Sequence, residues 1–121
     1  MDRITVKELR SLIEDGANPV ILDVRSDELR ARDGVIPGSI QAKLSELAQL
    51  RRVYATKSEI VVYCSCPNEA SAAVMARHLK RAGFARIRPL QGGIEAWALA
   101  GHPVERDEET GTEDLVEMAA A

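Results

Sequence analysis

The sequence predicts an α/β domain built on a mainly parallel sheet with helices on both faces. Two observations lead to this class. Short apolar runs alternate with longer amphipathic segments, in the order strand, helix, strand, helix, strand, helix. With 121 residues, of which 45% are hydrophobic, the chain is also long enough for one domain whose core needs no disulfide or metal.

Three short apolar runs predict the main strands, at residues 20–24, 60–63 and 87–90. They are too short for helices, and the first two are rich in Val and Ile, as in strands buried on both faces. Pro89 cannot donate a hydrogen bond to a neighbouring strand, so it places the third run at a sheet edge or at the end of its strand. Pro37-Gly38 forms a turn before a further short strand.

Apolar residues at helical spacing predict four helices. The first begins with a capping box, in which Thr5 caps the helix and Glu8 follows three residues later. The charged stretch 25–33 carries no predicted helix or strand. The four helices are expected between Thr5 and Gly16, at about residues 44–53, at about residues 72–82, and between Gly93 and Gly101.

Charge and cysteine content narrow the class of function. A net charge of −3 argues against nucleic acid or an anionic membrane surface as a partner. Two cysteines spaced two apart do not make a secreted disulfide framework, so a reducing, cytoplasmic compartment is expected. The acidic residues 106–121 are interpreted as a tail or linker, which leaves residues 1–105 as the domain.

Three features fall at the carboxyl ends of predicted strands, where open parallel sheets bind ligands. They are Asp23, Cys64 and Gln91-Gly92-Gly93. Cys64 lies between a strand and a helix, so main-chain N–H groups of the first helical turn can point at its sulfur. These groups favour a thiolate and hold a negatively charged intermediate, which predicts a nucleophile. The alternative is that Cys64 is a buried, inert thiol.

Several stretches match a known family in order and spacing: "ILDVRSDE" (21–28), "GVIPGSI" (34–40), "IVVYC" (60–64), "LKRAGF" (79–84), "LQGGIEAW" (90–97) and "GHPV" (101–104). From about Ile4 to Val104 the chain resembles the single-domain rhodaneses, also called rhodanese-like or sulfurtransferase domains. The resemblance implies a central five-stranded, mostly parallel sheet. It also implies that Asp23 and Arg25 brace the loops around the site.

The resemblance further implies that Cys64 takes sulfane sulfur as a persulfide and passes it to a thiophilic acceptor. The donor would be thiosulfate or a persulfide, and the acceptor a thiol or a cyanide-like nucleophile. No cofactor and no metal is expected for this reaction, because it needs only a thiolate and main-chain N–H groups.

The active loop departs from the family pattern. It reads Cys64, Ser65, Cys66, Pro67, Asn68, Glu69, Ala70 and Ser71, without the Arg and Gly that the family often carries there. In the family pattern the nucleophile directly follows the strand, and this position is Cys64. The family's usual spacing, counted back from Gly83, points instead to Cys66. Cys64 is the preferred nucleophile because a strand end is better fixed than a loop length.

The missing Arg predicts weak activity with thiosulfate and better activity with a persulfide donor, since a guanidinium helps to bind a doubly charged anion. Glu69 is expected to point outward at the first helical turn. The stretch "CPNEAS" resembles that of rhodanese domains attached to bacterial membrane proteins, which predicts a cytoplasmic domain of a larger membrane-associated chain.

Four other functions are weighed. Cys64 and Cys66 could form a thiol-disulfide redox device, although a disulfide across one residue is strained. The domain could be a non-catalytic interaction module. A phosphatase or arsenate reductase would need an Arg at the loop end, and a metal site would need more clustered ligands than these cysteines and His78 or His102. Trp97 is expected in the core, and His102 on the surface.

Overall fold

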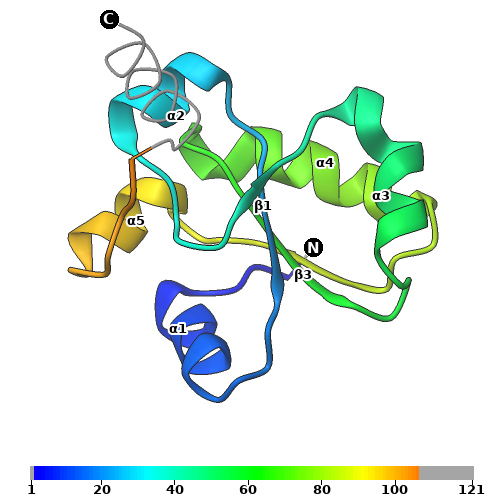
Figure 1. The fold of residues 1–121 in the computed structure, drawn as a ribbon, viewed down its shortest axis with the longest axis horizontal. Helices are drawn as coiled ribbons and strands as arrows, with labels where there is room; N and C mark the ends of the chain where they lie inside the picture. The colour runs from blue at the N-terminus through cyan, green and yellow to red at the C-terminus, as the bar shows by residue number, and fades with distance from the viewer. Residues whose placement is uncertain (1, 107–121) are drawn as a thin grey trace, which may run out of the picture.

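A computed structural model describes residues 2–106 of the chain, and Figure 1 shows the fold. Most of the predicted acidic tail, residues 107–121, lies outside the described range, so the domain boundary at residue 105 stays a prediction.

Within the described residues the sheet has four parallel strands in the order β2-β1-β3-β4. The three strands predicted from apolar runs are confirmed, and so is the short strand after Pro37-Gly38. Pro89 ends β4, which lies at the sheet edge as expected. The strands are β1 (Val20–Asp23), β2 (Ile40–Gln41), β3 (Glu59–Tyr63) and β4 (Arg86–Pro89).

The predicted fifth strand is absent from residues 2–106. Ile4 lies beside β4, donates to the carbonyl of Pro89 at 2.9 Å, and accepts from the N–H of Gln91 at 2.8 Å. This contact is a single bridge, between Ile4 and Leu90. It cannot lengthen because Thr5 already caps the first helix, so the backbone leaves the sheet at the next residue.

The predicted helices are confirmed. The capping box forms as expected, with the N–H of Glu8 donating to the Thr5 hydroxyl at 3.1 Å and the N–H of Thr5 donating to the Glu8 carboxylate at 3.0 Å. The helix predicted at residues 44–53 begins with a 3₁₀ turn, η1. The elements are α1 (Val6–Glu14), η1 (Leu44–Glu46), α3 (Leu47–Val53), η2 (Pro67–Glu69), α4 (Ala70–Arg81) and α5 (Gly93–Leu99).

One helix was not predicted. The charged stretch after β1 forms α2 (Asp27–Asp33), capped by the Ser26 side chain, which accepts from the N–H of Leu29 at 3.3 Å. Its inward face buries the charged Arg30 rather than apolar residues. Hydrophobic periodicity therefore gives no signal for this helix.

The core lies on both faces of the sheet, because neighbouring residues of each strand point in opposite directions. Leu22, Ile60 and Val62 pack on one face against Met75 and Leu79 of α4. Figure 1 shows α3 and α4 on the same side of the fold.

The other face of the sheet packs against α1 and α5. Ile21 and Val61 contact Leu9 of α1 and Ile94 and Trp97 of α5. The core position expected for Trp97 is confirmed, since its side chain is buried.

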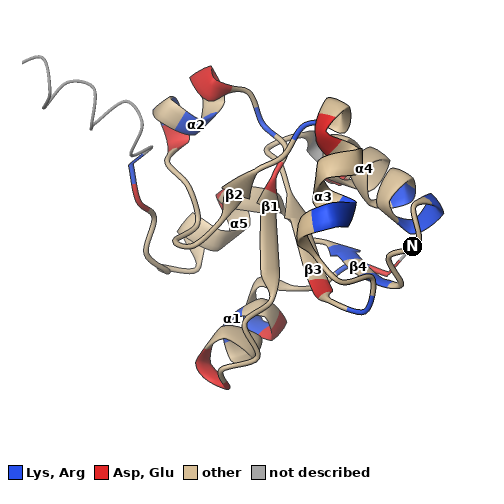
Figure 2. Ribbon diagram, turned by 45° about the vertical axis from the view of Figure 1, so that its right-hand side comes forward, with Lys and Arg blue, Asp and Glu red and all other residues tan. Residues whose placement is uncertain are grey.

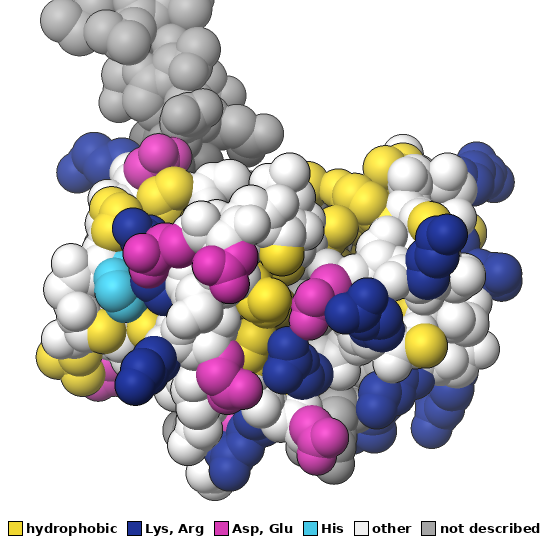
Figure 3. Space-filling view, turned by 90° about the horizontal axis from the view of Figure 1, so that it is seen from below, with side chains coloured by type: hydrophobic (Ala, Val, Ile, Leu, Met, Phe, Trp, Pro, Cys, Tyr) yellow, Lys and Arg dark blue, Asp and Glu magenta, His cyan; other side chains and the backbone are white. Residues whose placement is uncertain are grey.

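Charge lies mainly on helices and loops. In Figure 2, β1 is free of charged residues up to its carboxyl end, where Asp23 follows the apolar part of the strand. Acidic and basic side chains lie beside one another across the middle of the face in Figure 3. No helix within residues 2–106 has the length and apolar composition that a membrane span requires.

Candidate active site

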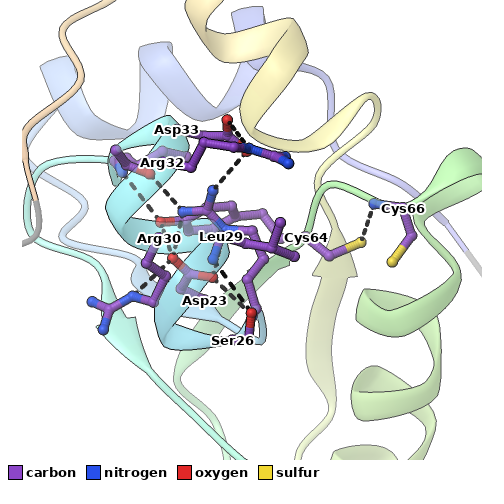
Figure 4. A network of polar contacts seen from close by, with 12 residues as sticks. Asp23, Ser26, Leu29, Arg30, Arg32, Asp33, Cys64 and Cys66 are labelled. Carbon is purple, nitrogen blue, oxygen red and sulfur yellow. Dashed lines mark hydrogen bonds and ion pairs between the residues drawn. The ribbon is translucent and has the colours of Figure 1, made fainter.

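The carboxyl ends of β1 and β3 bring Asp23 and Cys64 into one region. Asp23 pairs with Tyr63 in the parallel register, and Cys64 is the next residue of the chain. The alternation of side chains places Cys64 with Leu22 and Val62 in the cluster beneath α4. Asp23 and Tyr63 project to the other side, where the Tyr63 hydroxyl contacts the Asp23 carboxylate. The backbone thus separates the thiols Cys64 and Cys66 from the charged network around Asp23, which Figure 4 shows.

Cys64 is buried, with 1% of its surface exposed. Its sulfur accepts a hydrogen bond from the N–H of Cys66 at 3.5 Å (Figure 4) and another from the N–H of Ala72 in the first turn of α4. Burial raises the pKa of the Cys64 thiol, and the two N–H groups act against this rise. At neutral pH Cys64 is therefore a protonated thiol that faces main-chain donors.

Cys66 has a different environment. It is half-buried, and its sulfur shares a hydrogen bond with the Ser71 hydroxyl at 3.0 Å. That hydroxyl lowers the pKa of Cys66, and the N–H of Ser71 and the neighbouring Cys64 thiol lower it further. Cys66 is therefore the more acidic and the more accessible of the two thiols.

The loop between the thiols and α4 holds two non-glycine residues in the left-handed region. Asn68 has φ 54° and Glu69 has φ 54°. Such conformations cost about 1–3 kcal/mol each and persist where surrounding contacts fix them. The family often places Gly in this loop, and here Asn68 and Glu69 adopt the left-handed backbone instead.

The expectation that Glu69 points outward is wrong. Its side chain is buried, forms a salt bridge with Arg3 at 2.8 Å, and accepts from the N–H of Gly92 at 3.3 Å. The left-handed backbone turns the carboxylate toward these two donors, which compensate its buried charge. Glu69 thus ties the active loop to the N-terminal segment and to the start of α5.

The carbonyl of Cys64 is held from the side of α5. It accepts the N–H of Ile94 at 3.1 Å. Gly93 passes so close that a Cβ atom there would lie 2.0 Å from the Cys64 carbonyl oxygen. The Gly92-Gly93 pair predicted at this edge is therefore brought against the thiol loop, and only a glycine fits at position 93 without displacing it.

Asp23 is the centre of the charged network in Figure 4. Its carboxylate is fully buried and accepts from the main chain and side chain of Arg25, with the shortest distance 2.7 Å to Nη2. Arg30 lies 3.3 Å away through Nε, and the Tyr63 hydroxyl donates at 2.8 Å. Arg25 also donates to the carbonyl of Gly34 at 2.7 Å.

Tyr63 links this network to the segment after α2. Its hydroxyl accepts from the N–H of Ile36 at 3.1 Å and shares a hydrogen bond of 2.9 Å with Ser39. Burial, together with the nearby Asp23 carboxylate, raises the pKa of Tyr63 to about 12. The residue that precedes Cys64 is thus fixed as a neutral donor to Asp23.

Sequence reasoning missed Tyr63, Arg30 and Arg3 as neighbours of the site. Tyr63 had a usable signal, because a polar group that ends an apolar strand beside Asp23 must find a buried partner. Arg30 and Arg3 had none, since their contacts depend on how α2 and the N-terminal segment pack. His102, expected on the surface, is partly exposed, and the centroid of its ring lies 4.9 Å from that of Trp97.

Two cavities flank the loop. One, of about 430 Å³, includes Ser65 and the helix residues Asp33 and Glu95 in its lining. The other, of about 360 Å³, includes Ser71, and its other lining residues are Val24, Ala42, Lys43, Leu44, Val74 and Met75. Within residues 2–106 no three His, Cys, Asp or Glu side chains lie together as a metal site.

Comparison with known proteins shows the family to which the chain belongs. Residues 5–100 fit the family model of the Rhodanese-like domain. The chain belongs to the rhodanese family. A sulfurtransferase of Allochromatium vinosum is 28% identical to this rhodanese-like domain over 105 residues, which cover 86% of this chain and 94% of that protein.

Longer proteins also contain a similar domain. The adenylyltransferase and sulfurtransferase MOCS3 of Aedes aegypti is 31% identical over 106 residues, which cover 79% of this chain but 24% of that relative. The crystal structure of a thiosulfate sulfurtransferase from Pseudomonas aeruginosa has a TM-score of 0.76 and 27% identity, covering 88% of this chain and 20% of that one. The chain thus spans about a quarter or less of these two proteins.

Proposed function

We propose that this rhodanese-like domain transfers sulfane sulfur through a persulfide on its thiol loop, which the sequence assigns to Cys64. The observation that carries the proposal is the position of Cys64 and Cys66 between the end of β3 and the first turn of α4, where main-chain N–H groups point at sulfur. Such groups stabilise a thiolate and the charge of a bound persulfide.

The reaction has two displacements. A loop thiolate attacks the outer sulfur of the donor, a new S–S bond forms, and the donor's leaving group departs with the electron pair. An acceptor thiolate or cyanide then attacks the outer sulfur of the persulfide, and the cysteine leaves as a thiolate. One sulfur atom moves in total, and the protein returns to its starting state.

The Asp23–Arg25 pair has a bracing role in this proposal. It connects β1 with Gly34 through Arg25 and with the residue before Cys64 through Tyr63. Both side chains are almost fully buried, so neither presents a charge to a donor. Asp23 and Arg25 thus contribute by fixing the end of β3, from which the active loop starts.

Loss of both thiols is expected to abolish sulfur loading. Intact-protein mass spectrometry after incubation with a persulfide donor should show a gain of about 32 Da on the wild type, one sulfur atom, and none on the double variant Cys64→Ser/Cys66→Ser. Ser65→Ala is the matched loop control and should load like the wild type. An unloaded wild type with reduced thiols would refute the proposal in favour of a non-catalytic module.

The donor is expected to be an organic persulfide rather than thiosulfate. The cavity beside Ser71 has mainly apolar walls, which suit an organic substituent, and Lys43 is the single cation among its lining residues. Without an Arg in the loop, the domain should use thiosulfate at least about tenfold less efficiently in kcat/KM, since charge-assisted hydrogen bonds to the anion are missing. Equal kcat/KM values for the two donors would contradict this expectation.

A further inference from the structure

The two thiols of the active loop differ in exposure and in hydrogen-bond partners. The sequence favours Cys64 by the count from the strand, whereas the count back from Gly83 assigns the nucleophile to Cys66. We infer that Cys66 is the thiol that takes the sulfur, and that Cys64 and Ser71 are positioning residues that favour the thiolate form of Cys66. This inference rests on the proposed function.

Access is the first argument. A donor must bring its outer sulfur into line with the attacking sulfur. Cys64 is 1% exposed and lies in the core cluster with Val62 and Met75, so the donor cannot reach it without moving the loop. Cys66 is half-buried and open to solvent on one side.

Hydrogen bonding is the second argument. The Cys66 sulfur receives the hydroxyl of Ser71 at 3.0 Å and also the N–H of the same residue in the first turn of α4. The Cys64 thiol, two residues away, lowers the pKa of Cys66 further. The Ser71 hydroxyl beside the Cys66 sulfur therefore favours its anionic form.

The position in the chain is the third argument. Cys66 begins the turn that leads directly into α4 at Ala70. The backbone closes this turn, because the N–H of Glu69 donates to the carbonyl of Cys66 at 3.2 Å. Cys64 instead ends β3 and is fixed by Ile94 through its carbonyl. The first thiol therefore lies at the fixed end of the strand, and the second lies in the loop that leads to α4.

The loading step is a simple exchange. The Cys66 thiolate attacks the outer sulfur of R–S–SH, the new bond forms at Cys66 Sγ, and R–S⁻ leaves with the electron pair and takes a proton from water. Cys66 then carries –S–SH, and Cys64 keeps its proton throughout. No electrons are gained or lost overall, so the step needs no oxidant or reductant.

The test compares single variants by intact mass and by the rate of the gain in mass. Cys66→Ser is expected to load at least about tenfold more slowly than the wild type, since it loses both the exposed thiol and the more acidic one. Cys64→Ser should still take one sulfur, because serine keeps an O–H donor toward Cys66.

A second readout separates positioning from mere structure. Loading by Cys64→Ala and by Ser71→Ala should be slower near neutral pH and should recover at higher pH, because each lacks a donor to the thiolate and so raises the pKa of Cys66. Other charged groups also lie around the loop: Glu69, whose carboxylate is paired with Arg3, and Lys43, across the cavity that Ser71 lines. On the side of Ser65 the cavity is lined by Arg32, Asp33 and Glu95. The conservative Cys64→Ser should keep the wild-type pH profile.

The possible outcomes are distinct. Rapid loading of Cys66→Ser with none on Cys64→Ser would overturn the inference and assign the persulfide to Cys64, while the proposed function would stand. Loading of Cys64→Ala with an unchanged pH profile would refute the positioning role of Cys64. No adduct on the wild type would refute both the function and the inference.

Discussion

Replacing Asp23 with asparagine is expected to lower the free energy of unfolding by about 3–5 kcal/mol, the usual cost of leaving a buried charge without its partner. Asp23 is fully buried, and the Arg25 side chain is 1% exposed. Asparagine keeps the size of the side chain, but its N–H₂ group would face Arg25 and Tyr63, which in the wild type donate to the Asp23 carboxylate. Arg25 would remain charged with only Asp33, at 3.9 Å, as an acidic neighbour.

Urea denaturation followed by circular dichroism measures this change. Asp33→Asn is the matched control, because it removes the same charge from the same network at a more exposed position. Its main partner, Arg32, is 67% exposed, so the control should shift the free energy by less than about 1 kcal/mol. Equal shifts for the two variants would show that burial of Asp23 is not what makes the network stabilising.

Gly93→Ala should destabilise the protein by about 3 kcal/mol and slow sulfur loading. Position 93 has φ +59°, where any side chain costs about 1–2 kcal/mol, and the new Cβ would overlap the Cys64 carbonyl oxygen. The loop must then move, and the hydrogen bond from Ile94 to that carbonyl is lost. Because Cys64 carries this carbonyl, the thiol shifts with it.

Gly16→Ala separates backbone strain from the steric contact. Gly16 also has a positive φ, +76°, but a Cβ there meets no atom within 4 Å. We expect it to lose only about 1 kcal/mol and to load sulfur at the wild-type rate. The contrary result is that the two glycine variants lose the same free energy of unfolding and both load sulfur at the wild-type rate. That result would show that the close packing of α5 on the thiol loop does not affect sulfur loading.

Local signals in the sequence predicted most of the fold. The capping box at Thr5 and the apolar runs at β1 and β3 depend on neighbours within a few residues, and each formed where expected. The signals failed where packing replaces the usual pattern. In α2 the buried residue is Arg30, which forms a salt bridge with Asp23. This helix therefore forms without an apolar face.

The candidate site divides in the same way. The approach of Asp23, Cys64 and Gly93 to one sheet edge could be predicted, because parallel strands end on the same side. The orientation of Glu69 could not, since it depends on Arg3 from the opposite end of the domain. Hydrophobic periodicity reveals contacts between residues that lie close together in the chain, but it gives no signal for a contact such as Glu69 with Arg3.

The family, the order of the four confirmed strands and of the helices other than α2, and the presence of two thiols between a strand and a helix all follow from local patterns in the chain. Only the tertiary structure separated the thiols. Strand alternation buries Cys64 beneath α4, whereas the left-handed turn at Asn68 and Glu69 brings Ser71 to Cys66. Thiol acidity and access depend on desolvation and on donors from other turns of the chain, and these are properties of the packed structure.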